Sequence, residues 1–236
     1  MDRPKTLLLD LDNTLIDYQL DFVGCWRRAT EETATALGFD DAGALLGALR
    51  REVRKSFGDP SENWLTRDLR VAIHESASRA LQSVSLSDAH AGELVDRYDE
   101  VRDATTCLFP GALETIERFR AEGTCIGMVT NGNAGLQRSK IRRFALAPYF
   151  DSIHVEGEVG VGKPDPRIFQ AALDANASTP EDTWMVGDNL DKDVAGAQYV
   201  GIHAVWCDSQ REGLAPAADV APDRIVHRVS ELWGAE

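Results

Sequence analysis

From residue 106 onwards, strand-length apolar runs alternate with amphipathic stretches of helix length, and this alternation limits the folds open to the chain. The apolar runs are residues 125–130, 152–155, 184–187 and 203–206, and the helical stretches are residues 136–144, 167–175 and 194–199. Strands that alternate with helices form βαβ units in a parallel sheet. Leu7, Leu8 and Leu9 form an unbroken apolar run typical of a strand buried on both faces, so they join the same sheet. The sequence therefore predicts an α/β fold with a doubly wound parallel sheet.

Residues 17–105 follow a different pattern, in which apolar residues recur every three or four positions. The three stripes are Phe22, Cys25, Trp26, Ala29, Thr33, Ala36 and Leu37; Leu65, Leu69, Ala72, Ile73, Ala80 and Leu81; and Leu94, Val95, Tyr98 and Val101. This period is typical of helices with one buried face, and Gly58, Asp59 and Pro60 indicate a break between two of them. We predict a helical domain, residues 17–105, inserted after the first strand of a sheet domain formed by residues 1–16 and 106–236.

The charge balance restricts the partners that such a chain can have. The chain carries 25 Lys and Arg against 39 Asp and Glu, a net charge of −14, which disfavours binding to nucleic-acid polymers. No apolar run approaches the roughly 20 residues of a membrane helix, and the first residues lack the apolar core of a signal peptide. The four cysteines are scattered, without the spacing of a zinc site. We expect a cytoplasmic protein with reduced, mostly buried thiols and no membrane partner.

Polar residues stand where the predicted strands end. Asp10 ends the first strand, Thr130 the second and Asp188 the strand at 184–187, and Lys163 lies in a loop after Val155. The carboxyl ends of parallel strands share one edge of a sheet, where ligands bind in open α/β folds. These residues are therefore expected to converge on one site.

Asp10 and Asp12 stand two positions apart, so in an extended chain their carboxylates would point the same way, about 6 to 7 Å apart. One could attack a reacting centre while the other handles the proton of the leaving group. With Asp188 they would make an all-oxygen cluster fit for Mg²⁺, and the metal and the Lys163 ammonium would let an acidic protein bind an anion. The alternative is structural, with Asp10 a solvated residue and Asp12 part of a turn.

Three other segments have both a functional and a structural interpretation. Thr130, Asn131 and Gly132 offer donors to a phosphoryl oxygen, or form an Asn-Gly turn. Residues 157–163 match the first seven positions of a P-loop, but Pro164 replaces the hydroxyl residue that would bind Mg²⁺. This segment is better interpreted as a glycine-rich loop that lets Lys163 reach the strand ends. Asp193 could cap a helix, hold a metal-bound water or pair with Lys163.

Taken in order, these motifs resemble the haloacid dehalogenase superfamily of phosphohydrolases. They are Asp10-x-Asp12-x-Thr14, Thr130-Asn131-Gly132, Gly162-Lys163-Pro164 and Gly187-Asp188 followed by Asp193. The resemblance implies a Rossmann-like core, with the helical insertion as a C1 cap. The segment from Thr130 through Gln137 and Lys140 is most similar to the nucleotidase and N-acylneuraminate-9-phosphatase branch.

The resemblance also implies roles for the individual residues. Asp10 would be the nucleophile that forms an aspartyl-phosphate, and Asp12 the general acid that then becomes the base for water. Thr130 and Asn131 would hold the phosphoryl group, and Lys163 would steady that group and the nucleophile. Mg²⁺ would be bound by the Asp10 carboxylate, the Asp12 backbone carbonyl and Asp188, with Asp193 in support. Asp12 argues against the dehalogenases themselves, which lack that acid and need no metal.

The sequence therefore predicts a Mg²⁺-dependent phosphatase acting on a small phosphorylated metabolite, a nucleotide or a sugar phosphate. One alternative is a phosphomutase similar to β-phosphoglucomutase, which passes the phosphoryl group to a second hydroxyl. A more distant alternative is a signalling domain that holds the phosphoryl group without hydrolysis, although a large insertion and the position of Asp10 disfavour it. Substrate choice would come from the cap, in which the sequence assigns no role to its cationic residues Arg27, Arg50, Arg51, Lys55 and Arg67.

Overall fold

The computed structural model describes residues 3–18, 22–57, 69–215 and 219–233. They divide into two compact units: a sheet unit, Met1–Tyr18 with Cys107–Glu236, and a helical unit, Gln19–Thr106. The predicted break at residues 58–60, Leu65 and Arg67 lie outside the described residues, as do the side chains of Phe22 and Leu69.

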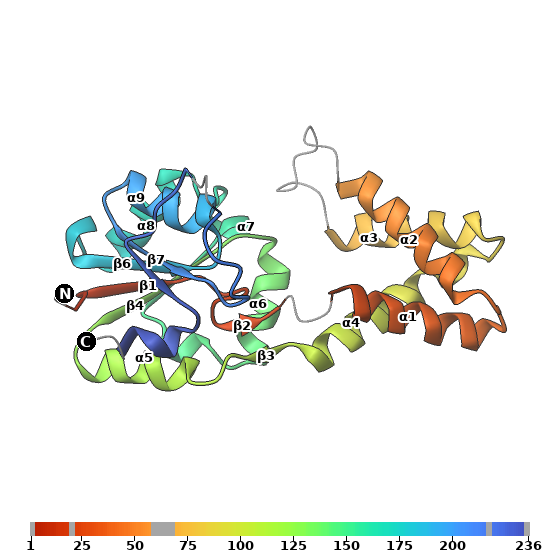
Figure 1. Cartoon of the computed structure of the whole chain (residues 1–236), viewed down its shortest axis with the longest axis horizontal. Helices are drawn as coiled ribbons and strands as arrows, with labels where there is room; N and C mark the ends of the chain where they lie inside the picture. The colour runs from red at the N-terminus through yellow and green to blue at the C-terminus, as the bar shows by residue number, and fades with distance from the viewer. Residues whose placement is uncertain (1–2, 19–21, 58–68, 216–218, 234–236) are drawn as a thin grey trace. The chain divides into compact units, whose positions relative to one another are not determined.

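The sheet unit is built on a six-stranded parallel sheet in the order β5-β4-β1-β6-β7-β8 (Figure 1). Its strands are β1 (Thr6–Leu9), β4 (Cys125–Thr130), β5 (Ser152–Val155), β6 (Thr183–Gly187), β7 (His203–Cys207) and β8 (Arg224–Val226). The predicted doubly wound parallel sheet is confirmed. Because β1 lies between β4 and β6, the loops after these three strands are neighbours at the carboxyl edge of the sheet.

Helices cover both faces of this sheet, with α8 and α9 on one side and α5 on the other (Figure 1). The helices are α5 (Ala112–Ala121), α6 (Ala134–Arg143), α7 (Glu156–Val159), α8 (Pro166–Ala175), a π-helical turn η4 (Leu190–Ala195) and α9 (Gly196–Tyr199), with 3₁₀ turns η2 (Ala147–Tyr149), η3 (Pro180–Asp182) and η5 (Val229–Trp233). Leu7 and Leu9 belong to the cluster that includes Phe119 of α5, while Leu8 belongs to the cluster that includes Phe169 of α8. Successive strand residues point to opposite faces, so an unbroken apolar run is what a doubly covered strand requires.

Two helices begin where the sequence supplies capping side chains. The Asn133 side chain accepts hydrogen bonds from the backbone N–H groups of Gly135 and Leu136 at the start of α6. Asp165 accepts from the N–H of Arg167 at the start of α8, with Pro166 in the first turn. Both satisfy backbone donors that have no partner inside the helix. They fix the starts of the helices that follow the Asn131 and Lys163 loops.

The structure contains short strands that the sequence analysis did not predict. These are β8 and an antiparallel pair, β2 (Ile16–Asp17) with β3 (Cys107–Leu108), in which Asp17 stands opposite Cys107. We call this pair the linker ribbon, because the chain runs from it into the helical unit and returns through it. Strands of two or three residues are too short to show a period, so the sequence pattern carries no signal for them.

The helical unit contains α1 (Phe22–Leu37), α2 (Ala42–Phe57), α3 (Leu69–Ser83), the 3₁₀ turn η1 (Asp88–His90) and α4 (Ala91–Thr105). Its core includes Trp26 and Tyr98, whose rings stack with centroids 3.8 Å apart. Buried members of the predicted stripes are Cys25, Trp26, Ala29, Thr33, Ala72, Ala80, Leu81, Leu94, Val95, Tyr98 and Val101. Ala36 is exposed and Leu37 is half-buried. The helical period therefore identified most of the buried face of this unit.

The four cysteines are free: Cys25 and Cys207 are buried, Cys125 is half-buried and Cys107 is exposed. Among the described residues, no helix combines the length and apolarity needed to cross a membrane.

Candidate active site

Three carboxylates meet at the carboxyl edge of the sheet. Asp10 follows β1, Asp188 follows β6, and Asp193 lies in η4; one oxygen of each lies within 4.8 Å of the others. Lys163 Nζ lies 2.7 Å from Asp10 Oδ1 and 2.6 Å from Asp193 Oδ1. We call these four residues the carboxylate cluster. The structure thus brings Asp10, Asp188, Asp193 and Lys163 together from three separate loops.

Burial dominates the electrostatics of this cluster. Burial raises the pKa of Asp10 to about 8; attraction by Lys163 opposes the shift, and repulsion by Asp193 and Asp188 adds to it. Burial and the charge of Asp193 raise the pKa of Asp188 to about 6, against a hydrogen bond from Asn13. Burial by itself lowers the pKa of Lys163, but Asp10 and Asp193 outweigh it and hold that pKa above its ordinary value. The lysine is therefore charged, and the carboxylates carry more negative charge than it balances.

The donor set of the cluster fits Mg²⁺. All of its acidic ligand atoms are carboxylate oxygens, the hard donors that Mg²⁺ prefers, and a divalent cation would balance their excess charge. Asp188 is held in place from two sides: Asn13 Nδ2 donates to Asp188 Oδ2 at 3.2 Å, and Trp206 Nε1 donates to the Asp188 backbone carbonyl at 2.7 Å. Such outer partners orient metal-binding carboxylates.

Asp193 reaches the cluster because a glycine stands behind it. A Cβ added at Gly187 would lie 2.2 Å from Asp193 Cγ, so no larger residue leaves room for this carboxylate. Asp193 Oδ2 accepts a hydrogen bond of 2.9 Å from the Asn189 backbone N–H. Of the roles left open for Asp193, the structure shows the ion pair with Lys163; the N-cap of η4 is Asn189, so Asp193 lies inside this turn and does not open it.

The Asp12 carboxylate is bound by two side chains of α6. Lys140 Nζ donates to both Asp12 oxygens at 2.8 Å, and Gln137 Nε2 donates to Oδ2 at 2.9 Å. The strand ends at Leu9, so the two-residue alternation of a strand is no guide to where the Asp12 side chain lies. A metal role for Asp12 then rests on its backbone carbonyl.

The Asn131 side chain forms two hydrogen bonds with the backbone of Lys163. Its Nδ2 donates to the Lys163 carbonyl and its Oδ1 accepts from the Lys163 N–H, both at 2.8 Å. Gly132 N–H donates to Glu156 Oε2 at 2.7 Å, and the buried Thr130 Oγ1 accepts from Gln137 Nε2 at 2.7 Å. The Gly132 N–H and one Asn131 amide N–H thus have protein partners, whereas the Thr130 hydroxyl accepts in its contact with Gln137. The Asn131 carboxamide positions the loop that carries Lys163.

Replacing Asn131 with alanine should therefore lower stability. The change leaves the N–H and carbonyl of Lys163 without their partner, and we expect a loss of about 1 to 2 kcal/mol in the free energy of unfolding. Urea unfolding monitored by circular dichroism measures this. Asn131→Asp, which retains the acceptor but opposes a carboxylate to the Lys163 carbonyl, should also be less stable than the wild type. Wild-type stability in both variants would contradict the positioning role.

Gln137 and Lys140 were not predicted as site residues. They stand three positions apart on α6, and both reach Asp12. Residues three apart share one face of a helix. Since α6 begins just after β4, this spacing could have indicated that both side chains face the site.

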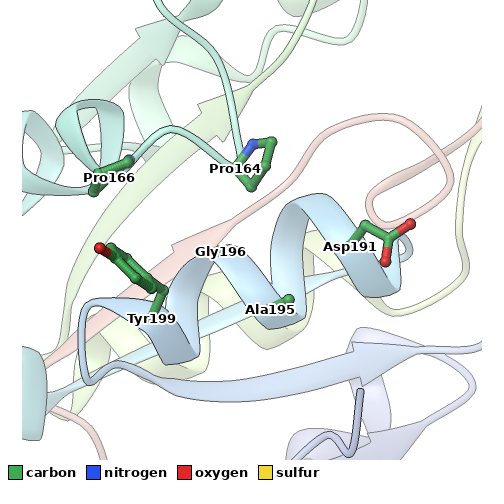
Figure 2. Close-up of a pocket in the computed structure, with 6 residues that line it drawn as sticks. All are labelled: Pro164, Pro166, Asp191, Ala195, Gly196 and Tyr199. Carbon is green, nitrogen blue, oxygen red and sulfur yellow. The ribbon is translucent and has the colours of Figure 1, made fainter. Parts of the chain in front are cut away.

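A separate pocket of about 390 Å³ lies in the sheet unit (Figure 2). Its described lining residues are Pro164, Pro166, Asp191, Ala195, Gly196 and Tyr199, with Tyr199 80% exposed. No residue of the carboxylate cluster is among these described lining residues. The pocket is therefore lined by two prolines on one side and by η4 and α9 on the other (Figure 2).

The helical unit has a basic pocket of about 360 Å³, whose described lining residues are Arg50, Arg51, Arg54 and Lys55 of α2. These four cations are exposed. An acidic chain therefore carries a local positive surface on this unit.

Comparison with known proteins gives consistent matches. A family model described as haloacid dehalogenase-like hydrolase matches residues 4–201. A phosphoserine phosphatase from Thermus thermophilus is 39% identical over 66% of this chain and 62% of its own length, so the match spans less than two thirds of that relative. A glyceraldehyde 3-phosphate phosphatase from Pyrococcus furiosus is 42% identical over 87% of this chain and 81% of its own. A human N-acylneuraminate-9-phosphatase is 28% identical over 98% of this chain and 93% of its own length.

A solved structure, a 2-haloacid dehalogenase from Pseudomonas syringae, has a TM-score of 0.67 and 29% identity over 98% of this chain and 96% of its own. The family match covers β1, the loops of the carboxylate cluster and the whole helical unit. The resemblance noted in the sequence motifs is thereby confirmed, and the chain belongs to the haloacid dehalogenase-like hydrolase family.

Proposed function

We propose that the chain is a Mg²⁺-dependent phosphatase that hydrolyses a small phosphorylated metabolite, a nucleotide or a sugar phosphate, through an aspartyl-phosphate. The observation that carries this proposal is the Asp10 carboxylate, buried at a strand end, 2.7 Å from the Lys163 ammonium and clustered with Asp188 and Asp193. This arrangement offers a nucleophile and positive charge to an anionic centre. Phosphoryl transfer depends mainly on positioning and on charge stabilisation.

In the first step, an Asp10 oxygen forms a bond to phosphorus while the bond to the leaving oxygen breaks, and Asp12 gives that oxygen a proton. In the second step, Asp12 takes a proton from water, the water oxygen bonds to phosphorus, and the bond to Asp10 breaks to release phosphate. Lys163 holds Asp10 in place and stabilises negative charge on the phosphoryl group.

The residues that would hold Mg²⁺ are the carboxylates of Asp10 and Asp188 and the backbone carbonyl of Asp12, with Asp193 in support. When bound, the ion would supply positive charge to the phosphoryl oxygens. Asp12 favours this over dehalogenation, because the resemblance implies that dehalogenases lack that acid and use no metal.

The relatives support small substrates. Their names give phosphoserine, glyceraldehyde 3-phosphate and an N-acylneuraminate 9-phosphate as the molecules they act on. We propose that residues 17–105 act as the cap that selects the substrate, and the basic pocket on α2 supports recognition of an anionic group.

We also propose a cytoplasmic location, supported by the four free cysteines.

A screen of purified protein against phosphorylated nucleotides, sugars and amino acids, with Mg²⁺ and a phosphate-release readout, tests the function. We expect released phosphate from a subset of these compounds and from p-nitrophenyl phosphate. Isomerised sugar phosphate without free phosphate would instead indicate a phosphomutase. A stable phosphoprotein that releases no phosphate would indicate a signalling domain.

A further inference from the structure

We propose that Lys140 is the positioning residue that sets the orientation of the Asp12 carboxylate for proton transfer. This inference rests on the proposed function, in which Asp12 exchanges a proton with the leaving group and with water. The sequence motifs place the reacting residues in the loops at the strand ends. This inference adds a residue of α6 that positions one of them.

The contact between the two residues is close and shielded. Lys140 Nζ lies 2.8 Å from each Asp12 oxygen, and the two side chains are 12% and 24% exposed. An ammonium that meets both oxygens fixes the plane of the carboxylate, whereas a single contact would let it rotate. Exposed ion pairs contribute little because water competes for both partners, but these side chains are mostly covered.

Lys140 is itself held from the other side. Its Nζ lies 3.4 Å from the centroid of the Tyr18 ring, a cation–π contact. Tyr18 directly follows β2, one arm of the linker ribbon. The ammonium therefore has a fixed place between a ring and a carboxylate.

The same helix face ties Asp12 to the end of β4. Gln137, one turn before Lys140, donates to Asp12 and also lies within hydrogen-bond distance of Thr130 Oγ1 and the Asn131 carbonyl, at 2.7 and 2.9 Å. The turn that carries Asp12 is closed by the backbone bond from Asn13 N–H to the Ile16 carbonyl, which does not orient the Asp12 side chain. The direction of that carboxylate is therefore set by α6.

A misplaced proton donor should matter most when the leaving group is a strong base. Phenyl phosphate and p-nitrophenyl phosphate differ only by the para-nitro group, but phenolate is the much stronger base and needs a proton as it leaves. For Lys140→Met, which keeps an unbranched stem beside Tyr18, we expect kcat on phenyl phosphate to fall by about 10- to 100-fold. On p-nitrophenyl phosphate we expect a loss of about threefold or less, and KM should change little on either compound.

A double-mutant cycle tests whether Lys140 acts through Asp12. In an Asp12→Asn background, Lys140→Met should change kcat on phenyl phosphate by less than about twofold, because the group it positions is gone. Lys140→Arg should retain more activity than Lys140→Met, since it keeps the charge. Arg142→Met is the matched control: it removes an exposed cation of α6 and should keep wild-type kcat. Equal losses in both backgrounds, or equal losses on both compounds, would overturn the proposal.

A second cycle needs no turnover. In metal-free buffer, Lys140→Met should lower the urea midpoint of the native chain more than that of the Asp12→Asn chain, because only the former has an ion pair to lose. Equal shifts would show that the contact is absent and would also overturn the proposal.

If the wild-type chain releases no phosphate while this coupling is present, the proposed function fails and the contact stands. If phosphate is released and either cycle shows no coupling, the role of Lys140 fails alone.

Discussion

Asp10→Asn should reduce phosphate release from p-nitrophenyl phosphate by at least about 10⁴-fold, which in practice means to background. An asparagine has nearly the same shape, but its amide is a poor nucleophile and does not form the acyl phosphate. The fold should survive the change. Burial raises the pKa of Asp10 to about 8, so the charged form is disfavoured at this position and a neutral amide is tolerated. We expect a metal-free melting temperature no lower than that of the wild type.

Asp191→Asn is the matched control for this experiment. Asp191 lies in η4, two residues from Asp193, but it is exposed and outside the carboxylate cluster. The control makes the same carboxylate-to-amide change close to the cluster and should retain wild-type turnover. Retained turnover in Asp10→Asn would exclude Asp10 as the nucleophile, whatever the other residues do.

Removal of divalent metal with EDTA should also lower turnover to background, and excess Mg²⁺ should restore it. Three carboxylates face one ammonium in the cluster, so a phosphoryl dianion would meet net negative charge there without a cation. Binding of Mg²⁺ to the folded chain should stabilise it, by about 2.7 kcal/mol at a concentration 100 times Kd. Thermal unfolding with and without Mg²⁺ measures this without any substrate.

The variant Asp188→Asn separates metal binding from other effects of EDTA. It removes one proposed ligand charge, so the rise in melting temperature with Mg²⁺ should shrink, and more Mg²⁺ should be needed for turnover. Asp191→Asn should respond to Mg²⁺ as the wild type does. Full activity in EDTA, or the same stabilisation by Mg²⁺ in Asp188→Asn, would contradict the proposed metal site.

The sequence allowed the gathering of the cluster to be predicted because burial and topology act together. The run Leu7 to Leu9 indicates a strand covered on both faces, and a parallel sheet brings the ends of such strands to one edge. That was enough to bring Asp10 and Asp188 together. Lys163 could be added because a glycine-rich loop precedes it.

The same reasoning could not predict where side chains point once the strand has ended. Asp12 lies beyond the end of β1 at Leu9, so strand alternation could not show that its carboxylate contacts Gln137 and Lys140. The Asn131 amide can donate to a substrate or to the backbone, and only the position of Lys163 shows that it does the latter. Such choices depend on neighbours that are distant in sequence.

The linker ribbon has a consequence for how such a protein can diversify. Asp17 and Cys107 stand opposite each other in an antiparallel pair, so the helical unit occupies the place of a hairpin loop. A tight turn of a few residues could join the two arms in its stead, leaving all six sheet strands intact. If the helical unit selects the substrate as proposed, it is in this sense an exchangeable module, which can be lengthened, shortened or swapped by recombination while the reacting groups keep their places.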